Sequence, residues 1–183
     1  MTVSLLRHGK TAANAQRLYC GQTDVDVSET GIVELLELKK TVAYPSAKIF
    51  AASGLKRTVT TLEILYGVQP SIIIPELMEY DFGSFEMKSH DELEHDPSYI
   101  KWIANEDARC PGGESRTEFH TRIRAGFDRL KTISGTVCIC HGGVIATLME
   151  SLFPGKRGFY EWQPGFGRGY AVTYGADISF TAI

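Results

Sequence analysis

In Val3-Ser4-Leu5-Leu6-Arg7-His8-Gly9, an apolar, strand-like run stops at an arginine, a histidine and a glycine. A second run, Val137-Cys138-Ile139-Cys140, stops in the same way at His141-Gly142-Gly143. Short apolar runs of this kind are typical of strands buried on both faces. Because each histidine is followed by glycine, which has no side chain, both imidazole rings are expected to be open to a small anion at a strand end.

Strand and helix patterns alternate along the rest of the chain, from which we predict a three-layer α/β/α sandwich with a mainly parallel central sheet. Ser28 is the expected N-cap of one helix, with Ile32, Leu35, Leu36 and Leu38 on its apolar side, and Gly67 is expected to end another. The predicted strands are 2–7, 48–53, 71–74, 136–140, 169–174 and 178–182. The predicted helices are 29–43, 55–66, 114–133 and 143–152.

The stretch at about 76–113 differs from the rest because it is acidic and aromatic and is interrupted by glycines and prolines. Short helices are predicted near 89–95 and 98–106. We interpret this stretch as a cap-like insertion in a single domain that spans 1–183, since the length of 183 residues fits one core. The aromatic segment 159–170, with three glycines, is either a mobile rim or a plain surface loop.

Composition narrows the class of protein. Hydrophobic residues make up 43% and charged residues 22%, as in ordinary globular proteins, and the net charge of −3 gives no footprint for nucleic acid. No signal peptide or membrane span is indicated, and four cysteines are too few for a disulfide framework, so the expected location is the cytoplasm. Cys138 and Cys140 are expected to pack as small apolar groups, because a C-x-C metal site would need further ligands nearby.

Polar groups stand at or just after four predicted strands: Arg7 and His8, the segment from Ser53 to Arg57, Glu79, and His141. Ligands of parallel α/β sheets bind outside the carboxyl ends of the strands. These groups are therefore expected to converge in space although they are scattered in sequence.

The chemistry of this set favours a phosphoryl group. An arginine fork matches two phosphate oxygens, and a neutral imidazole can act as a nucleophile. The helix after His141 would point its free N–H groups at the same anion. A leaving alkoxide needs a proton, for which the candidates are Glu76, Glu79, Asp81 and Glu86; Glu79 is favoured because it lies shortly after a strand end. No metal-ligand spacing joins the other histidines, so no metal or cofactor is predicted.

These residues give the sequence a resemblance to the histidine phosphatase superfamily, the phosphoglycerate mutase-like enzymes. The segments that resemble the family, in the expected order, are Leu6-Arg7-His8-Gly9-Lys10-Thr11 with Asn14, Gly21-Gln22-Thr23-Asp24, Ser28-Glu29-Thr30-Gly31, Ser53-Gly54-Leu55-Lys56-Arg57-Thr58, residues 77–86, Pro111-Gly112-Gly113-Glu114-Ser115, and Cys140-His141-Gly142-Gly143.

The resemblance implies a role for each matching residue. His8 would be the phosphorylated nucleophile, Glu79 the proton donor and later the base for water, and His141 the third catalytic group. Neither cofactor nor metal would be needed. The residues that would bind the phosphoryl group or the substrate are Arg7, Asn14, Cys20, Gly21, Gln22, Arg57 and Gly142.

Within the superfamily, the short chain and Gln22, where a mutase usually has tryptophan, look more like the small phosphatases of the α-ribazole phosphatase type. The expected activity is hydrolysis of a small phosphorylated metabolite, with α-ribazole 5′-phosphate as one candidate. The alternatives are a phosphoglycerate mutase and a non-catalytic phospho-ligand binding module. Met87 stands where the family commonly has glycine, Gly54 where it has an acidic residue, and Lys10 where an acidic residue is frequent. The sequence does not indicate an oligomeric state.

Overall fold

The fold is described by a computed structural model that covers residues 1–105 and 107–183. Within these residues six strands form one sheet in the order β3-β2-β4-β1-β5-β6. The strands are β1 (Thr2–Arg7), β2 (Ile49–Ala52), β3 (Ile72–Ile73), β4 (Thr136–Cys140), β5 (Gly169–Tyr174) and β6 (Ile178–Ala182). The first four run parallel, whereas β5 is antiparallel to β1 and β6. The predicted mainly parallel sheet is confirmed.

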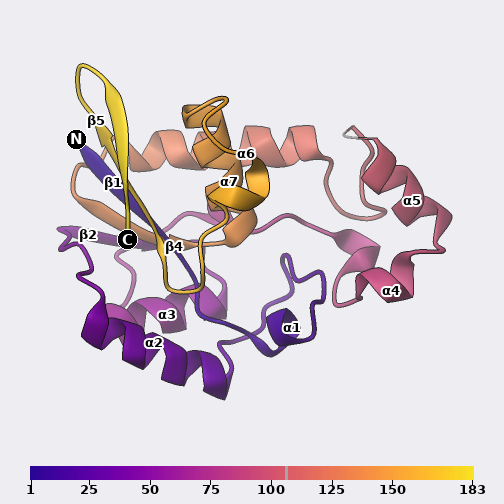
Figure 1. Cartoon of the computed structure of the whole chain (residues 1–183), viewed down its shortest axis with the longest axis horizontal. Helices are drawn as coiled ribbons and strands as arrows, with labels where there is room; N and C mark the ends of the chain where they lie inside the picture. The colour runs from indigo at the N-terminus through magenta and orange to yellow at the C-terminus, as the bar shows by residue number, and fades with distance from the viewer. Residues whose placement is uncertain (106) are drawn as a thin grey trace.

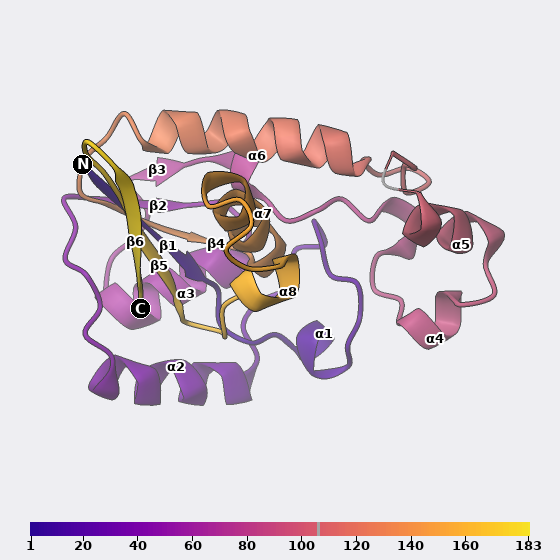
Figure 2. The same ribbon diagram turned by 45° about the horizontal axis from the view of Figure 1, so that its top comes forward.

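Helices cover both faces of the sheet, which confirms the three-layer sandwich (Figure 2). One face carries α6 (Arg116–Leu130) and α7 (Gly142–Leu152), and the opposite face carries α2 (Glu29–Thr41) and α3 (Lys56–Tyr66). Because β1, β2 and β4 are parallel, the loops that follow them emerge at the same end of the sheet. None of the described helices combines the length and the apolar character needed to cross a bilayer.

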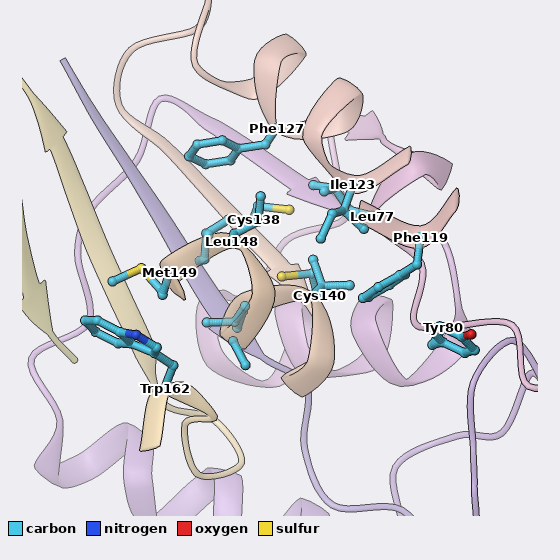
Figure 3. Packing of buried hydrophobic residues seen from close by; sticks show 14 of the residues in the cluster. Leu77, Tyr80, Phe119, Ile123, Phe127, Cys138, Cys140, Leu148, Met149 and Trp162 are labelled. Atoms are coloured by element: carbon cyan, nitrogen blue, oxygen red, sulfur yellow. The ribbon is translucent and has the colours of Figure 1, made fainter. Parts of the chain in front are cut away.

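Strand β4 supplies both cores by the alternation of its side chains. Val137 and Ile139 pack with the α2 and α3 side. Cys138 and Cys140 pack against α6 and α7, in the cluster that Figure 3 shows with Phe127 and Leu148. All four side chains are at most 1% exposed. The two thiols therefore serve as small apolar groups, as the sequence predicted.

The predicted helix ends are largely confirmed. The Ser28 hydroxyl accepts from the N–H of Gly31 at 3.1 Å and caps α2, and Gly67 ends α3 with a φ of 71°. The prediction for Leu36 is wrong: it is 45% exposed while Leu35 is fully buried. Successive helical residues are turned by about 100°, so only one of this adjacent pair can face the sheet.

The segment between β3 and α6 projects beyond the end of the sheet (Figure 1). It contains two 3₁₀ turns, η1 (Pro75–Leu77) and η2 (Gly83–Phe85), followed by α4 (His90–Leu93) and α5 (Pro97–Ala104). The helix predicted near 98–106 extends over residue 106, which lies outside the described residues. Two one-turn helices were not predicted: α1 (Ala12–Ala15), and α8 (Phe159–Trp162) in the segment expected to be a rim or a loop.

Candidate active site

The two histidines that follow β1 and β4 lie side by side. These strands are parallel neighbours, with Arg7 in register with Cys140, and the backbone N–H of His8 donates to the carbonyl of Cys140 at 3.0 Å. The ring centroids of His8 and His141 are 5.2 Å apart, with an interplanar angle of 60°. Two short apolar strands thus bring together imidazole rings that are separated by most of the chain.

His8 has the geometry of a nucleophile. Its ring is buried, and Nδ1 lies 2.7 Å from the carbonyl oxygen of Gly9. A carbonyl can only accept, so Nδ1 carries the proton and the lone pair of the neutral ring is on Nε2. Burial, and next the positive charge of Arg57, lower the pKa of His8 well below its usual range. The ring is therefore neutral at physiological pH.

His141 is held from the neighbouring strand β2. The hydroxyl of Ser53, the first residue after β2, lies 2.8 Å from Nε2 of His141. The other ring nitrogen, Nδ1, is buried and has no hydrogen-bond partner among the described residues. Burial and the charge of Arg57 also lower the pKa of His141 well below its usual range. A neutral ring with its proton on Nδ1 can donate to an anion in the site.

Arg7 and Arg57 are fixed by backbone carbonyls. Arg57, at the start of α3 and 1% exposed, donates through Nη1 to Thr23 at 2.9 Å and through Nη2 to the carbonyl of Gly21. Arg7 donates from Nη1 to Pro164 at 2.8 Å, and its guanidinium lies over the Phe166 ring at 4.0 Å. Backbone carbonyls thus fix the orientation of both guanidinium groups.

One further donor of each guanidinium is unpaired. Nε of Arg7 and Nε of Arg57 are buried and have no partner in the part of the chain that the structure describes, as is the case for Nδ1 of His141. Buried polar groups without partners are rare and costly in folded proteins. The pKa of both arginines is lowered by burial and raised in part by the nearby carboxylate of Glu79. These three buried nitrogens can pair with the oxygens of a small anion.

Among the four candidate acids, Glu79 is the one that lies at the start of α7. Its carboxylate accepts from the N–H of Gly143 at 2.9 Å and from that of Tyr80 at 3.0 Å. A Cβ at Gly143 would come within 2.4 Å of a Glu79 oxygen, so a side chain there would displace this carboxylate. The Glu79 carboxylate thus lies beside Gly143, two residues after His141.

The other three acids have structural partners. The Glu86 carboxylate accepts from the backbone N–H groups of Gly21, Gln22, Thr23 and Phe82, at 2.9 to 3.3 Å. Asp81 accepts from the N–H of Gly83 at 3.0 Å. Glu76 pairs with Arg129 at 2.7 Å on the surface. Glu86 and Asp81 thus hold turns of the backbone, and Glu76 forms a surface ion pair.

Asn14, Gly21 and Gln22, three further residues predicted to bind the ligand, hydrogen-bond to other parts of the chain. Asn14 uses its carboxamide oxygen to accept from the backbone N–H and the hydroxyl of Thr11, at 3.1 and 3.0 Å, and so caps α1. Gly21 and Gln22 present their N–H groups to Glu86, and Gly21 gives its carbonyl to Arg57. Gly21 thus helps to hold Arg57 through its carbonyl, and the contact of Gly21 and Gln22 with a ligand stays a prediction.

Cys20 and Gly142 border the same site. Cys20 is half-buried, and burial raises the pKa of its thiol while the charge of Arg57 lowers it. Gly142 begins α7, and a Cβ there would come within 2.9 Å of Nε of Arg7 and 2.8 Å of Nε2 of Gln163. A side chain at this position would therefore crowd the unpaired donor of Arg7.

Sequence reasoning gave no role to Ser53, Phe166, Gln163 or Arg122. Ser53 could have been found, because it follows β2 just as the two histidines follow β1 and β4. Phe166 and Gln163 lie in the segment between α8 and β5, and the path of this segment brings them close to Arg7. No local pattern in the sequence signals that path.

Several known proteins are similar to this chain. The family model described as histidine phosphatase superfamily (branch 1) matches residues 3–164. The adenosylcobalamin/α-ribazole phosphatase of Salmonella typhimurium (strain LT2) is 30% identical over 160 residues, which cover 83% of this chain and 79% of that protein. A protein of Yersinia pestis (strain Pestoides F), named "Probable phosphoglycerate mutase GpmB", is 31% identical over 83% of this chain and 74% of its own.

Solved structures include both kinds of relative. The α-ribazole phosphatase from Shigella flexneri superimposes with a TM-score of 0.87 at 25% identity and covers 100% of this chain and 96% of that one. The phosphoglycerate mutase from Thermus thermophilus gives a TM-score of 0.77 at 27% identity, with 100% and 98% covered. The fold is thus shared with both.

Proposed function

The chain belongs to the histidine phosphatase superfamily, and we propose that it hydrolyses a small phosphomonoester through a phosphorylated His8. The observation that carries this proposal is the set of three buried, unpaired donors, on Arg7, Arg57 and His141, around a neutral histidine with a free Nε2. A phosphoryl group supplies the acceptors that these donors lack. Its positioning and its charge stabilisation are the main tasks of a phosphoryl-transfer site.

In the first step Nε2 of His8 attacks phosphorus and forms an N–P bond, while the P–O bond to the alcohol breaks. The three unpaired donors stabilise the charge on the phosphoryl oxygens. The leaving alkoxide takes the proton of Glu79, which is the candidate acid placed beside the second histidine. The alcohol departs, and His8 carries the phosphoryl group.

In the second step Glu79, now a carboxylate, accepts a proton from water as the water oxygen attacks phosphorus. The N–P bond breaks, inorganic phosphate leaves, and the electron pair returns to Nε2 of His8. The acid of the first step is thus the base of the second, and no further group has to change its protonation state.

For the substrate, we propose α-ribazole 5′-phosphate, because α-ribazole phosphatase is the name of the Salmonella and Shigella relatives. Phosphoglycerate mutase is the second candidate, because relatives with that name cover as much of this chain. The same site would then return the phosphoryl group to the sugar acid instead of to water. All four cysteines are free thiols, which fits a reducing compartment, and we propose the cytoplasm as the location.

The test is a steady-state and quench-flow comparison on p-nitrophenyl phosphate, α-ribazole 5′-phosphate and 3-phosphoglycerate. We expect a burst of alcohol, an acid-labile phosphoenzyme, and a loss of roughly 10⁴-fold or more in kcat for His8→Ala. The control is His95→Ala, which changes a histidine on the surface with a 94% exposed side chain. Wild-type turnover by His8→Ala would refute the mechanism, and isomerisation of 3-phosphoglycerate faster than its hydrolysis would favour the mutase.

A further inference from the structure

Arg122 is a largely buried guanidinium to which the proposed mechanism gives no task. It lies on α6, and its side chain is 23% exposed. Its Nη1 donates to the carbonyls of Glu76 at 2.8 Å and Met78 at 2.9 Å. Its Nη2 donates to the carbonyl of Glu79 itself at 3.1 Å. Three backbone carbonyls of the segment that carries the acid thus converge on one side chain.

The carboxylate of Glu114 completes this arrangement. It accepts from Nε of Arg122 at 3.1 Å and from Nη2 at 2.5 Å. One of its oxygens also accepts from the backbone N–H of Asp81 at 2.9 Å. The five N–H donors of the guanidinium are therefore all used, and the pair anchors the backbone on both sides of Glu79.

From this geometry we propose that Arg122, oriented by Glu114, is a positioning residue that holds the Glu79 carboxylate at the place where the leaving alkoxide forms. This inference rests on the proposed function. Arg122 does not itself bind the phosphoryl group, because none of its donors is left over for an anion. Its charge does reach the site, since it contributes to lowering the pKa of His141, after burial, Arg57 and His8.

The arrangement requires arginine in particular. A lysine has three donors on a single point charge, whereas the planar guanidinium directs five donors in fixed directions. The Glu114 carboxylate, with its side chain 12% exposed, needs the bidentate partner as well. Arg122→Lys is therefore expected to keep only some of the hydrogen bonds to the backbone around Glu79.

Arg129 offers a matched control on the same helix. It lies further along α6 and contacts the same segment, but through the surface carboxylate of Glu76, with its own side chain 53% exposed. Replacing it removes one arginine and one contact to the segment without touching the backbone around Glu79. An exposed pair of this kind contributes little to stability.

The experiment compares Arg122→Met, Arg122→Lys and Arg129→Met on p-nitrophenyl phosphate, which leaves without protonation, and on an alkyl phosphate, which needs the acid. We expect Arg122→Met to lower the single-turnover rate of the first step by roughly 10- to 100-fold for the alkyl phosphate and by less than about 3-fold for p-nitrophenyl phosphate. Arg122→Lys should show the same selective loss on the alkyl phosphate, but a smaller one. Arg129→Met should leave the rates on both substrates unchanged.

A double-mutant cycle separates positioning from general loss of structure. In a Glu79→Gln background, Arg122→Met should cause no further loss on the alkyl phosphate, because the group it positions is no longer an acid. Equal losses on both substrates, or full additivity with Glu79→Gln, would overturn the inference. If Arg122→Met does not fold, the ratio of the two rates in Arg122→Lys decides, and an unchanged ratio overturns it.

The two proposals can fail separately. A wild-type protein without phosphohistidine or phosphatase activity would refute the proposed function. A wild-type enzyme with the expected burst and the expected Glu79→Gln behaviour, combined with an unselective Arg122→Met, would refute only the role of Arg122.

Discussion

The hydroxyl of Ser53 and Nε2 of His141 are 2.8 Å apart, and this contact holds the imidazole ring with Nδ1 as the nitrogen that has no partner among the described residues. If Nδ1–H is to donate to the phosphoryl group, Nε2 must accept, and the Ser53 hydroxyl is the donor it accepts from. Ser53 thus orients the ring of His141 without itself needing to touch the substrate.

We therefore expect Ser53→Ala to lower kcat/KM for p-nitrophenyl phosphate and for alkyl phosphates by about the same factor, roughly 10- to 100-fold. The reason is that a wrongly oriented His141 weakens phosphoryl binding whatever the leaving group is. The control is Ser28→Ala, which removes a helix cap and should cost about 1 kcal/mol of stability with unchanged rates. Selective loss on alkyl phosphates alone would contradict this role of Ser53.

Glu79→Gln is expected to behave in the opposite way. An amide has one acceptor oxygen for the two backbone N–H groups of Tyr80 and Gly143 and supplies no acidic proton. Poor leaving groups should therefore slow by roughly 10²- to 10⁴-fold and p-nitrophenyl phosphate only slightly in the first step. Burst kinetics on both substrates check this. Asp81→Asn is the control, because Asp81 contacts the turn at Gly83 instead. If Asp81→Asn and Glu79→Gln gave the same leaving-group dependence, the assignment of the acid would be wrong.

The sequence predicted the mainly parallel sheet and the strand-end residues because both follow from local patterns: apolar runs, their length and what stands directly after them. It did not predict how Arg57 is held, because Glu86, Gly21 and Thr23 meet only through a turn whose backbone N–H groups surround a carboxylate. Backbone carbonyls and N–H groups carry no sequence signal of their own. The same holds for Arg122, whose partners include three carbonyls of another segment.

The two buried histidines should make the protein less stable in acid. Each has a pKa in the folded state well below its usual range, while in the unfolded chain it titrates near about 6.5. Below that pH the unfolded state binds more protons than the folded state, so the free energy of unfolding falls as the pH falls. The slope is up to about 1.4 kcal/mol per pH unit for each histidine.

Urea denaturation between about pH 6.5 and pH 5, above the range in which most carboxylates titrate, measures this slope. A His8→Ala/His141→Ala variant should lose most of it, and His95→Ala, changed at an exposed site, should retain it. A slope that survives in the double variant would show that other groups cause the acid sensitivity.

Met87 stands in a backbone conformation that favours glycine. Its φ is 60°, in the left-handed region, where a Cβ costs roughly 1 to 2 kcal/mol, and the residue is 37% exposed. The backbone N–H of Met87 donates to the carbonyl of Tyr19 at 2.7 Å, which holds the strained conformation in place.

Met87→Gly should therefore raise the free energy of unfolding by about 1 kcal/mol, because the gain at positive φ exceeds the loss from the more flexible unfolded chain. Met87→Ala is the matched control, since it removes the side chain but keeps the Cβ, and it should give no such gain. Arg17→Gly, at the other described non-glycine residue with positive φ, should be stabilising as well. Equal stability of the Gly and Ala variants at position 87 would mean that the exposed side chain, and not the backbone, determines the cost at this site.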